Sequence, residues 1–131
     1  MNNHIILGVI VSEVRFLTSE NGRSFLAFRV QDRTRYNTEH NCYNNFPVLR
    51  YGKEEELREL QKSLEIGSAV YVCGEGLYNQ KRYYNVIANR IEKIDNLHAE
   101  VEIVHTSYYE QFFQTSGSET TVVEEERDEE S

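Results

Sequence analysis

The sequence predicts an all-β domain with a single helix, built in the order β-β-β-α-β-β. Short runs of alternating apolar residues recur along residues 1–95, and residues such as Gly, Asn and Pro stand between them, which is typical of strands joined by turns. Only residues 54–65 space their leucines as a helix does. The length of 131 residues is close to that of one domain, so we expect these elements to share one core.

The first two predicted strands cover residues 5–11 and 24–31, because apolar side chains alternate along both. Gly8 interrupts the first strand and indicates a bulge or a close approach of another backbone. Asn21-Gly22 favours a tight hairpin turn before the second strand, since both residue types tolerate a positive φ. The phenylalanines of this region are expected in the core: Phe16, Phe25 and Phe28.

The third predicted strand covers residues 46–51, and the helix covers residues 54–65. Pro47 places the start of the strand at an edge or a bulge, because proline has no N–H for the ladder. Gly67 stands where the helix is expected to have ended. One face of the helix carries three leucines: Leu57, Leu60 and Leu64.

Residues 32–45 lie between the second and third strands and are rich in Asn, Thr and Arg without an apolar period. This composition predicts a long loop that is either functional or disordered. Two further strands are predicted over residues 69–75 and 82–94, with a short connection around Asn79-Gln80. Five strands with one helix between the third and the fourth match the layout of the five-stranded OB-fold barrel.

The charge is unevenly distributed along the chain. The net charge is −8, yet residues 1–95 carry +1, residues 96–116 carry −3 and residues 117–131 carry −6. We expect residues 1–95 to form the barrel domain and residues 96–116 to be a linker or an extra strand over residues 99–105. Residues 117–131 are polar and low in complexity, which predicts a disordered acidic tail. Within residues 1–53, seven bases against four acids give a basic lean.

Several function classes are excluded by what the sequence lacks. No run of 18 apolar residues is present, so we expect no membrane partner, and the N-terminus lacks the basic region of a secretory signal. The two cysteines, Cys42 and Cys73, form no C-x-x-C pair and suit a reducing cytoplasm. No nucleotide-binding or hydrolase motif is present, which predicts a binding module without cofactor or metal and not an enzyme.

The order of these elements and four local strings resemble the single-stranded DNA-binding protein family of bacteria and phages. The resemblance covers residues 1–95, about three quarters of the chain. The strings are the opening N-x-x-I-x-x-G that ends at Gly8, Glu13-Val14-Arg15-Phe16, Val48-Leu49-Arg50-Tyr51-Gly52-Lys53, and Leu64-x-x-Gly67-Ser68-x-Val70-Tyr71-Val72-x-Gly74. This resemblance implies an OB fold, sequence-independent binding of single-stranded DNA in replication or recombination, and a homotetramer, with a dimer as the alternative.

The chain also departs from the family pattern. Ser12 stands where the family usually has proline, and Asn45 aligns with a family aromatic, so that Phe46 is one position late. The sequence has no Trp, and it lacks the acidic Pro-Phe tip with which the family recruits replication or recombination proteins. The primosomal DNA-binding relatives, which share the barrel, remain an alternative family.

Binding of single strands without sequence preference requires cations that follow the phosphates and aromatic rings on which bases stack. Both residue types alternate in the middle of the chain, in regions that an OB barrel brings to one concave face. Tyr71 is instead expected to pair across the sheet or to lie in a subunit interface. The candidate DNA-binding residues are Arg15, Arg29, Arg33, Arg35, Tyr36, Phe46, Arg50, Tyr51, Lys53, Tyr78, Lys81, Arg82 and Tyr83.

A different class of function is also compatible with the sequence. Residues 108–113 read YYEQFF, and they precede the acidic tail. An OB-fold adaptor could contact other proteins through these two segments, or the chain could act as a primosomal accessory protein. Binding to an oligo-dT strand distinguishes the DNA-binding hypothesis from the adaptor hypothesis.

Overall fold

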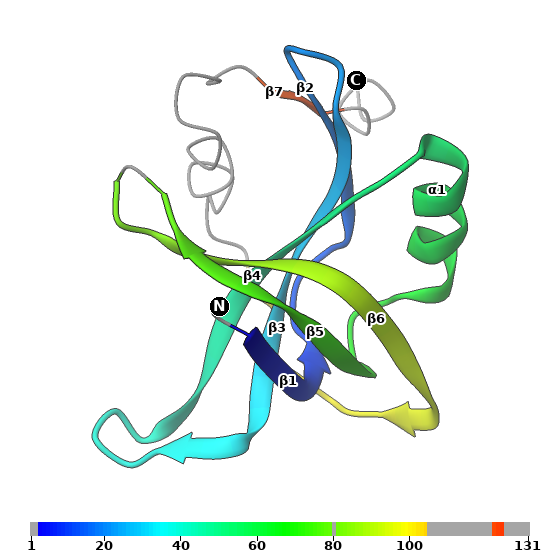
Figure 1. The fold of residues 1–131 in the computed structure, drawn as a ribbon. Helices are drawn as coiled ribbons and strands as arrows, with labels where there is room; N and C mark the ends of the chain where they lie inside the picture. The colour runs from blue at the N-terminus through cyan, green and yellow to red at the C-terminus, as the bar shows by residue number, and fades with distance from the viewer. Residues whose placement is uncertain (1–2, 80, 105–121, 125–131) are drawn as a thin grey trace.

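The computed structural model describes residues 3–79, 81–104 and 122–124 (Figure 1). One helix and seven strands are present in these residues. Their bounds are β1 Asn3–Ile10, β2 Arg15–Ser19, β3 Ser24–Asn37, β4 Cys42–Tyr51, α1 Glu54–Ser63, β5 Ser68–Tyr78, β6 Tyr84–His98 and β7 Val122–Glu124.

The strands form one sheet in the order β1-β5-β6-β4-β3-β2-β7, and an additional pairing between β1 and β3 closes it. β1 and β2 follow each other around the barrel, separated by a bend at residues 11–14, and both pair antiparallel with β3. β4 and β6 run parallel, with Val48 opposite Val86. Counting β1 and β2 as one bent strand, the structure is a five-stranded mixed barrel with its helix between β4 and β5. The predicted OB-fold class is confirmed.

The closure of the barrel depends on Gly8. A Cβ atom at this position would lie 1.9 Å from the backbone oxygen of Gln31, on the strand with which β1 pairs there. Only a residue without a side chain lets the two backbones approach this closely. The close approach predicted from the sequence is therefore confirmed.

The Asn21-Gly22 turn joins β2 to β3 as predicted. Gly22 has a φ of 90°, the left-handed conformation that glycine adopts without strain. The backbone N–H of Gly22 donates to the carbonyl oxygen of Ser19, and the N–H of Ser19 donates to the carbonyl oxygen of Arg23. β2 itself, only five residues long, is a strand that the sequence pattern did not predict.

Residues 32–45, predicted to be a loop, instead extend β3 and β4 into a long hairpin arm. β3 continues to Asn37 and β4 begins at Cys42, with a change of register between Gln31 and Tyr36. The prediction was wrong because polar and aromatic cross-strand pairs stabilise this arm where an apolar period is missing. The side chain of Asn37 donates to that of Asn44, and the Tyr36 and Tyr43 rings are 5.0 Å apart.

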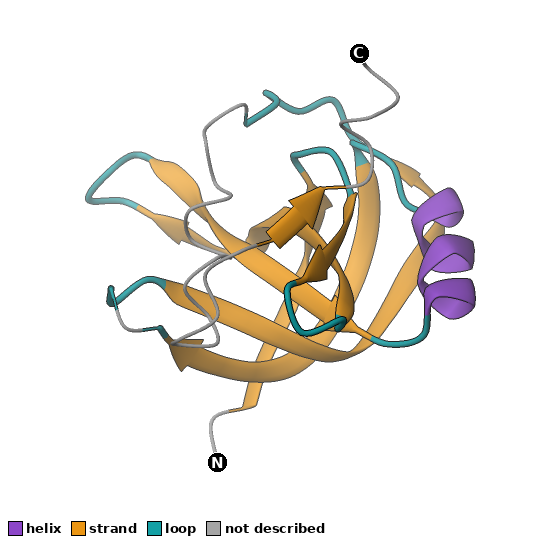
Figure 2. Ribbon diagram, turned by 90° about the horizontal axis from the view of Figure 1, so that it is seen from above, coloured by secondary structure: helices purple, strands orange, loops and turns teal. Residues whose placement is uncertain are grey.

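The helix α1 lies against one side of the barrel (Figure 2). Three glutamates occupy its first turn, where the helix dipole favours negative charge. Leu57 and Leu64 are buried in the inner core of the barrel. Gly67 follows with a φ of 96°. The predicted helix is confirmed, although it ends at Ser63.

The strands bury apolar side chains on both faces. Phe16 and Phe28 belong to the inner core, together with most other buried residues. A second cluster lies on the opposite face of the same strands, because neighbouring residues of a strand point to opposite sides. We call it the outer cluster, and its members are at most 2% exposed: Leu17, Phe25, Ala27 and Leu49.

The C-terminal region differs from the prediction where it can be compared. β6 extends to His98, and residues 99–104 contain no strand, so the described part of the strand expected over 99–105 is not formed. Backbone hydrogen bonds instead join Ala99 to Gly67 and Val104 to Val11. Of the two predictions for this region, an extra strand or a linker, only the linker agrees with residues 99–104.

Of the predicted acidic tail, residues 117–131, the structure describes only β7. These three residues pair antiparallel with β2, so the expectation of disorder does not hold for them. The rest of the tail and residues 105–116 lie outside the described residues. No helix within the described ranges is long and apolar enough to cross a membrane.

Candidate nucleic-acid interface

A pocket of about 610 Å³ opens where β4 meets the hairpin of β5 and β6. We call it the aromatic pocket. Five separate strands or their connections contribute to it, which brings together residues that are far apart in the sequence. Its lining residues are His4, Arg29, Asn44, Asn45, Phe46, Pro47, Tyr78, Tyr83 and Tyr84.

The rings of this pocket meet edge to face or tilted. The centroid of Phe46 lies 4.7 Å from that of His4 and 6.0 Å from that of Tyr84, and Tyr78 lies 5.1 Å from Tyr84. Tyr78 is 72% exposed. Its ring therefore stands at the rim of the pocket, available for stacking with a planar ligand.

A short hydrogen bond joins His4 and Tyr84 inside the pocket, with 2.6 Å between Nδ1 and the phenol oxygen. Burial lowers the pKa of His4 and raises the pKa of Tyr84, so both side chains are neutral at pH 7. Gly76 makes room for this arrangement, because a Cβ atom there would lie 1.8 Å from the Tyr84 hydroxyl oxygen. The ring of Tyr84 thus covers β5 where β5 lacks a side chain.

Arg29 supplies the positive charge of the aromatic pocket. Its side-chain Nε donates to Oδ1 of Asn45 at 2.5 Å. Its backbone N–H donates to the hydroxyl of the buried Ser12 at 2.8 Å, which fastens β3 to the bend between β1 and β2. Ser12 therefore has a structural role at the position where the resembling family has proline.

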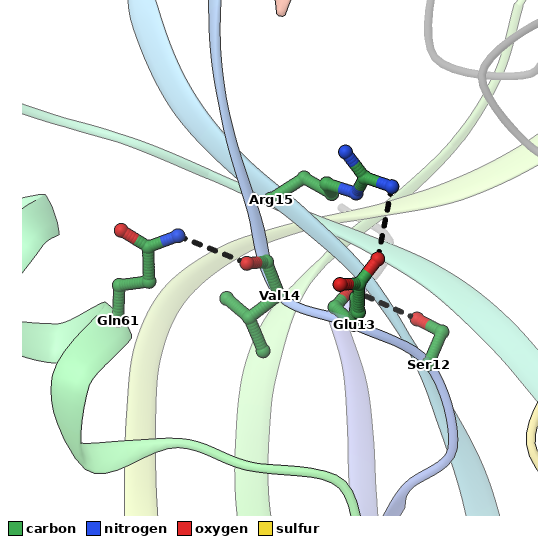
Figure 3. Close-up of polar contacts among 5 residues, drawn as sticks. All are labelled: Ser12, Glu13, Val14, Arg15 and Gln61. Atoms are coloured by element: carbon green, nitrogen blue, oxygen red, sulfur yellow. Dashed lines mark hydrogen bonds and ion pairs between the residues drawn. The ribbon is translucent and has the colours of Figure 1, made fainter. Parts of the chain in front are cut away.

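Arg15, at the start of β2, does not line the aromatic pocket, and Figure 3 shows it beside Glu13 of the bend. Arg15 forms an ion pair of 2.9 Å with Glu13, and its side chain is 16% exposed. The side chain of Gln61, on α1, donates to the carbonyl oxygen of Val14 at 3.0 Å. The contact of Gln61 joins the bend to the helix.

A second pocket, of about 570 Å³, lies at the other end of β4, and we call it the Tyr51 pocket. The guanidinium of Arg23 stands 4.1 Å from the centre of the Tyr51 ring, and the ring of Phe25 lies 5.0 Å away. Lys53 and Glu54 line the same pocket. Pro47, Leu49 and Tyr51 alternate along one face of β4, whereas Phe46 lies on the other face with Val48 and packs against the inner core. The rings that β4 contributes to the two pockets therefore lie on opposite faces of this strand.

The hairpin arm carries a third group of candidates. Arg33, Arg35 and Tyr36 are exposed on β3. The guanidinium of Arg33 lies 5.3 Å from the centre of the Tyr43 ring, and Tyr36 donates its hydroxyl to Asn41. Cations and rings thus alternate along the arm.

The predicted residues therefore form several groups rather than a single one. Arg29, Phe46, Tyr78 and Tyr83 share the aromatic pocket, while Tyr51 and Lys53 share the Tyr51 pocket. Lys81 and Arg82 are exposed in the connection between β5 and β6, beside Tyr83. Arg50 lies on the opposite face of β4 from Tyr51 and donates to the carbonyl oxygen of Ala88 at 3.3 Å.

Comparison with solved structures finds proteins that share this fold. The mitochondrial single-stranded DNA-binding protein Rim1 of S. cerevisiae superposes with a TM-score of 0.61 at 18% identity, over 76% of this chain and 97% of Rim1. The second single-stranded DNA-binding protein of Mycobacterium smegmatis gives a TM-score of 0.59 at 22% identity, over 77% of this chain and 97% of that one. The chain has the fold of single-stranded DNA-binding proteins.

The N-terminal domain of PriB from Thermoanaerobacter tencongensis, described as dimeric, shares this fold. Its TM-score is 0.54 at 21% identity, over 72% of this chain and 98% of that domain. No protein-family model matches the sequence, and a search of curated proteins found no significant match. The resemblance to single-stranded DNA-binding proteins is therefore confirmed by the fold, at low sequence identity.

Within this single-stranded DNA-binding fold, several pocket residues were missed by the sequence analysis. His4 and Tyr84 reach the aromatic pocket only because β1 and β6 both pair with β5. Asn45, noted only as replacing an aromatic residue, lies in the same pocket. Arg23 could have been found, since it directly follows the predicted Asn21-Gly22 turn.

Proposed function

We propose that the chain binds single-stranded DNA without sequence preference and protects it during replication or recombination. The aromatic pocket carries this proposal. It combines an exposed ring, Tyr78, with partly buried rings and the guanidinium of Arg29, which are the two components of single-strand binding. Solved structures with the same fold are single-stranded DNA-binding proteins, which supports the proposal.

The other two groups extend this surface. The Tyr51 pocket offers a ring beside Arg23 and Lys53, and the hairpin arm offers Arg33 and Arg35 beside tyrosines. Cations spaced along a path neutralise successive phosphates, while the rings stack on any base. The chain acts as a binding module in this proposal, with no step of catalysis.

The proposal includes a homo-oligomer, a tetramer in preference to a dimer. Ile5 and Leu7 on β1 are 55% and 44% exposed, a large apolar area for two neighbouring positions of one face. In the described residues, β1 pairs with β3 only from Gly8 onward, so one edge of its first half is open to a second copy. Tyr71, opposite Leu7 on β5, adjoins this area, in agreement with an interface role.

The similarity of the fold to that of PriB favours a second candidate function, that of a primosomal accessory protein. Such a protein would also bind DNA, so partners rather than DNA affinity would distinguish the two. A protein-protein adaptor without DNA affinity is the further alternative.

Titration of the full chain with oligo-dT and with duplex DNA tests the proposal. We expect tight binding of the single strand, weak binding of the duplex, and a log-log salt slope of about −0.7 per phosphate neutralised. Equal affinity for both forms at moderate salt would refute single-strand binding. Absence of binding to either would favour the adaptor.

A further inference from the structure

Several arginines stand over aromatic rings, and Arg23 differs from the others in what else its guanidinium contacts. The guanidinium of Arg23 lies 4.1 Å from the centre of the Tyr51 ring, and it forms no ion pair or hydrogen bond with the described part of the chain. Within these residues its N–H donors remain open to a ligand. Three other arginines also bind a second side chain, in the pairs Arg33 with Gln31, Arg58 with Glu54, and Arg90 with Glu92.

The backbone of Arg23 is fixed in the turn between β2 and β3. Its N–H donates to the hydroxyl of Ser19 at 3.1 Å, and its carbonyl oxygen accepts the N–H of Ser19 at 2.8 Å. Gly22, directly before it, has the φ of 90° that this turn requires. The exposed side chain of Arg23 therefore starts from a fixed point beside Tyr51.

The ring of Tyr51 is held from the side of the barrel. Tyr51 lies opposite Phe25 in the pairing of β3 with β4, and the two ring centroids are 5.0 Å apart. The half-buried Tyr51 also packs against the outer cluster. Arg23 and Phe25 thus both occupy part of the surface of this ring, whereas Tyr78 is 72% exposed. Tyr51 therefore offers a base less ring area than Tyr78 does.

The charges of the Tyr51 pocket suit an anion. Lys53 is exposed there and forms no ion pair with the residues that the structure describes. Glu54 is the one acid among the described residues that line the pocket, and it pairs with Arg58 at 3.7 Å. A guanidinium that covers a ring still donates through the N–H groups in its own plane, and phosphate oxygens accept two such hydrogen bonds side by side.

We propose that Arg23 binds a phosphate of the DNA strand in the Tyr51 pocket, and that Tyr51 is a positioning residue that holds this guanidinium and stacks no base. This inference rests on the proposed function and names the chemical group bound at this pocket. A long side chain loses conformational freedom when a phosphate fixes it. A ring that already holds the guanidinium reduces this loss on binding.

Titration of three full-length chains with oligo-dT tests the role of the ring. Tyr51→Phe keeps the ring and should bind as the wild type does. Tyr51→Leu keeps an apolar side chain on the outer cluster but removes the ring, and it should bind about two- to fivefold more weakly, the range of an exposed cation–π contact. Its log-log salt slope should fall toward that of Arg23→Gln, because the loss acts through a phosphate contact.

A double-mutant cycle separates positioning from stacking. In the Arg23→Gln background, Tyr51→Leu should cause no further loss of affinity, since the group that the ring holds is already absent. In the Lys53→Gln background, the matched control, Tyr51→Leu should cause its full loss. If Tyr51→Leu does not fold, Arg23→Lys tests the same contact, because it keeps the charge without the planar group and should bind severalfold more weakly.

The outcomes separate this inference from the proposed function. Additive losses in the cycle, or an unchanged salt slope in Tyr51→Leu, would show that the ring stacks a base and would overturn the positioning role while single-strand binding stands. Wild-type affinity in Arg23→Lys would overturn it as well. Failure of the wild-type chain to bind oligo-dT would overturn both proposals.

Discussion

The two pockets along β4 differ in how the chain builds them. The Tyr51 pocket joins only two short segments, residues 22–24 at the start of β3 and residues 51–54 between the end of β4 and the start of α1. The aromatic pocket combines His4, Phe46 and Tyr84 from three strands that are distant in the sequence. The Tyr51 pocket is dominated by charge, whereas the aromatic pocket combines its rings and the His4–Tyr84 hydrogen bond with a single guanidinium, that of Arg29.

This difference indicates that the two pockets contact different parts of a bound strand, one the phosphates and the other the bases. In the Tyr51 pocket, Arg23 stands over the ring at 4.1 Å, and Lys53 is exposed beside it, so phosphate contacts should dominate. In the aromatic pocket, Tyr78 presents an exposed ring beside that of Tyr84, so base contacts should dominate. The predictions below test whether the two contributions can be separated.

The largest effect is expected from Tyr78→Ala. The substitution removes an exposed stacking ring, so oligo-dT affinity should fall by roughly 1–3 kcal/mol without loss of fold stability. Tyr51→Ala should weaken binding less, because Arg23 already covers one side of that ring. Fluorescence titration and urea unfolding of both variants measure these effects. Wild-type affinity in both variants would show that neither ring stacks a base.

A matched pair of glycines tests the geometry of the two pockets. Gly76→Ala places a methyl group where the Tyr84 hydroxyl lies, at 1.8 Å, and should displace that ring and weaken oligo-dT binding by about 1 kcal/mol. Gly52→Ala, in the Tyr51 pocket, meets Leu57 at 3.4 Å, an ordinary contact, and should bind as wild type does. Equal losses in both would contradict the specific role of Tyr84.

The fold was predictable because its main signals are local. Alternation along residues 24–31, the leucine spacing of α1 and the Asn21-Gly22 turn each act within one element. The hairpin arm was not predictable in this way, because its strands are exposed and depend on cross-strand pairs such as Tyr36 with Tyr43. A hydrophobic period exists only where one face of a strand is buried.

The candidate site was predictable to the extent that single residues carry it. Tyr78 and Arg29 follow from the search for cations and rings, and both line the aromatic pocket. His4 and Asn45 carry no such signal, since their positions depend on the pairing of β1 with β5 and of β4 with β3. The role of Arg50 stays a prediction, and strand alternation places it on the face of β4 that carries Phe46 and not on that of Tyr51.

A smaller effect is expected on the salt dependence of binding. Arg23→Gln should reduce the log-log salt slope by about 0.7 if it neutralises one phosphate, and Lys53→Gln should do the same. Tyr78→Ala should lower affinity at every salt concentration and leave the slope unchanged. Titrations at several NaCl concentrations provide the slopes. A changed slope in Tyr78→Ala would show that the aromatic pocket also depends on charge.

The smallest effect concerns the stability of the aromatic pocket at acidic pH. Burial, opposed by Asp32 and assisted by Arg35, lowers the pKa of His4 in the folded chain below its ordinary value of 6.5. As the pH falls through 6.5, the unfolded chain therefore binds a proton at His4 before the folded chain does, and the free energy of unfolding decreases. His4→Gln cannot titrate, so its unfolding free energy should fall less than that of the wild type between about pH 7.5 and pH 5. Urea unfolding of both chains at the two pH values measures the difference, and the carboxylates, common to both, cancel in it. A parallel decline of the two chains would mean that protonation of His4 costs the folded state nothing, and that the hydrogen bond to Tyr84 does not depend on a neutral imidazole.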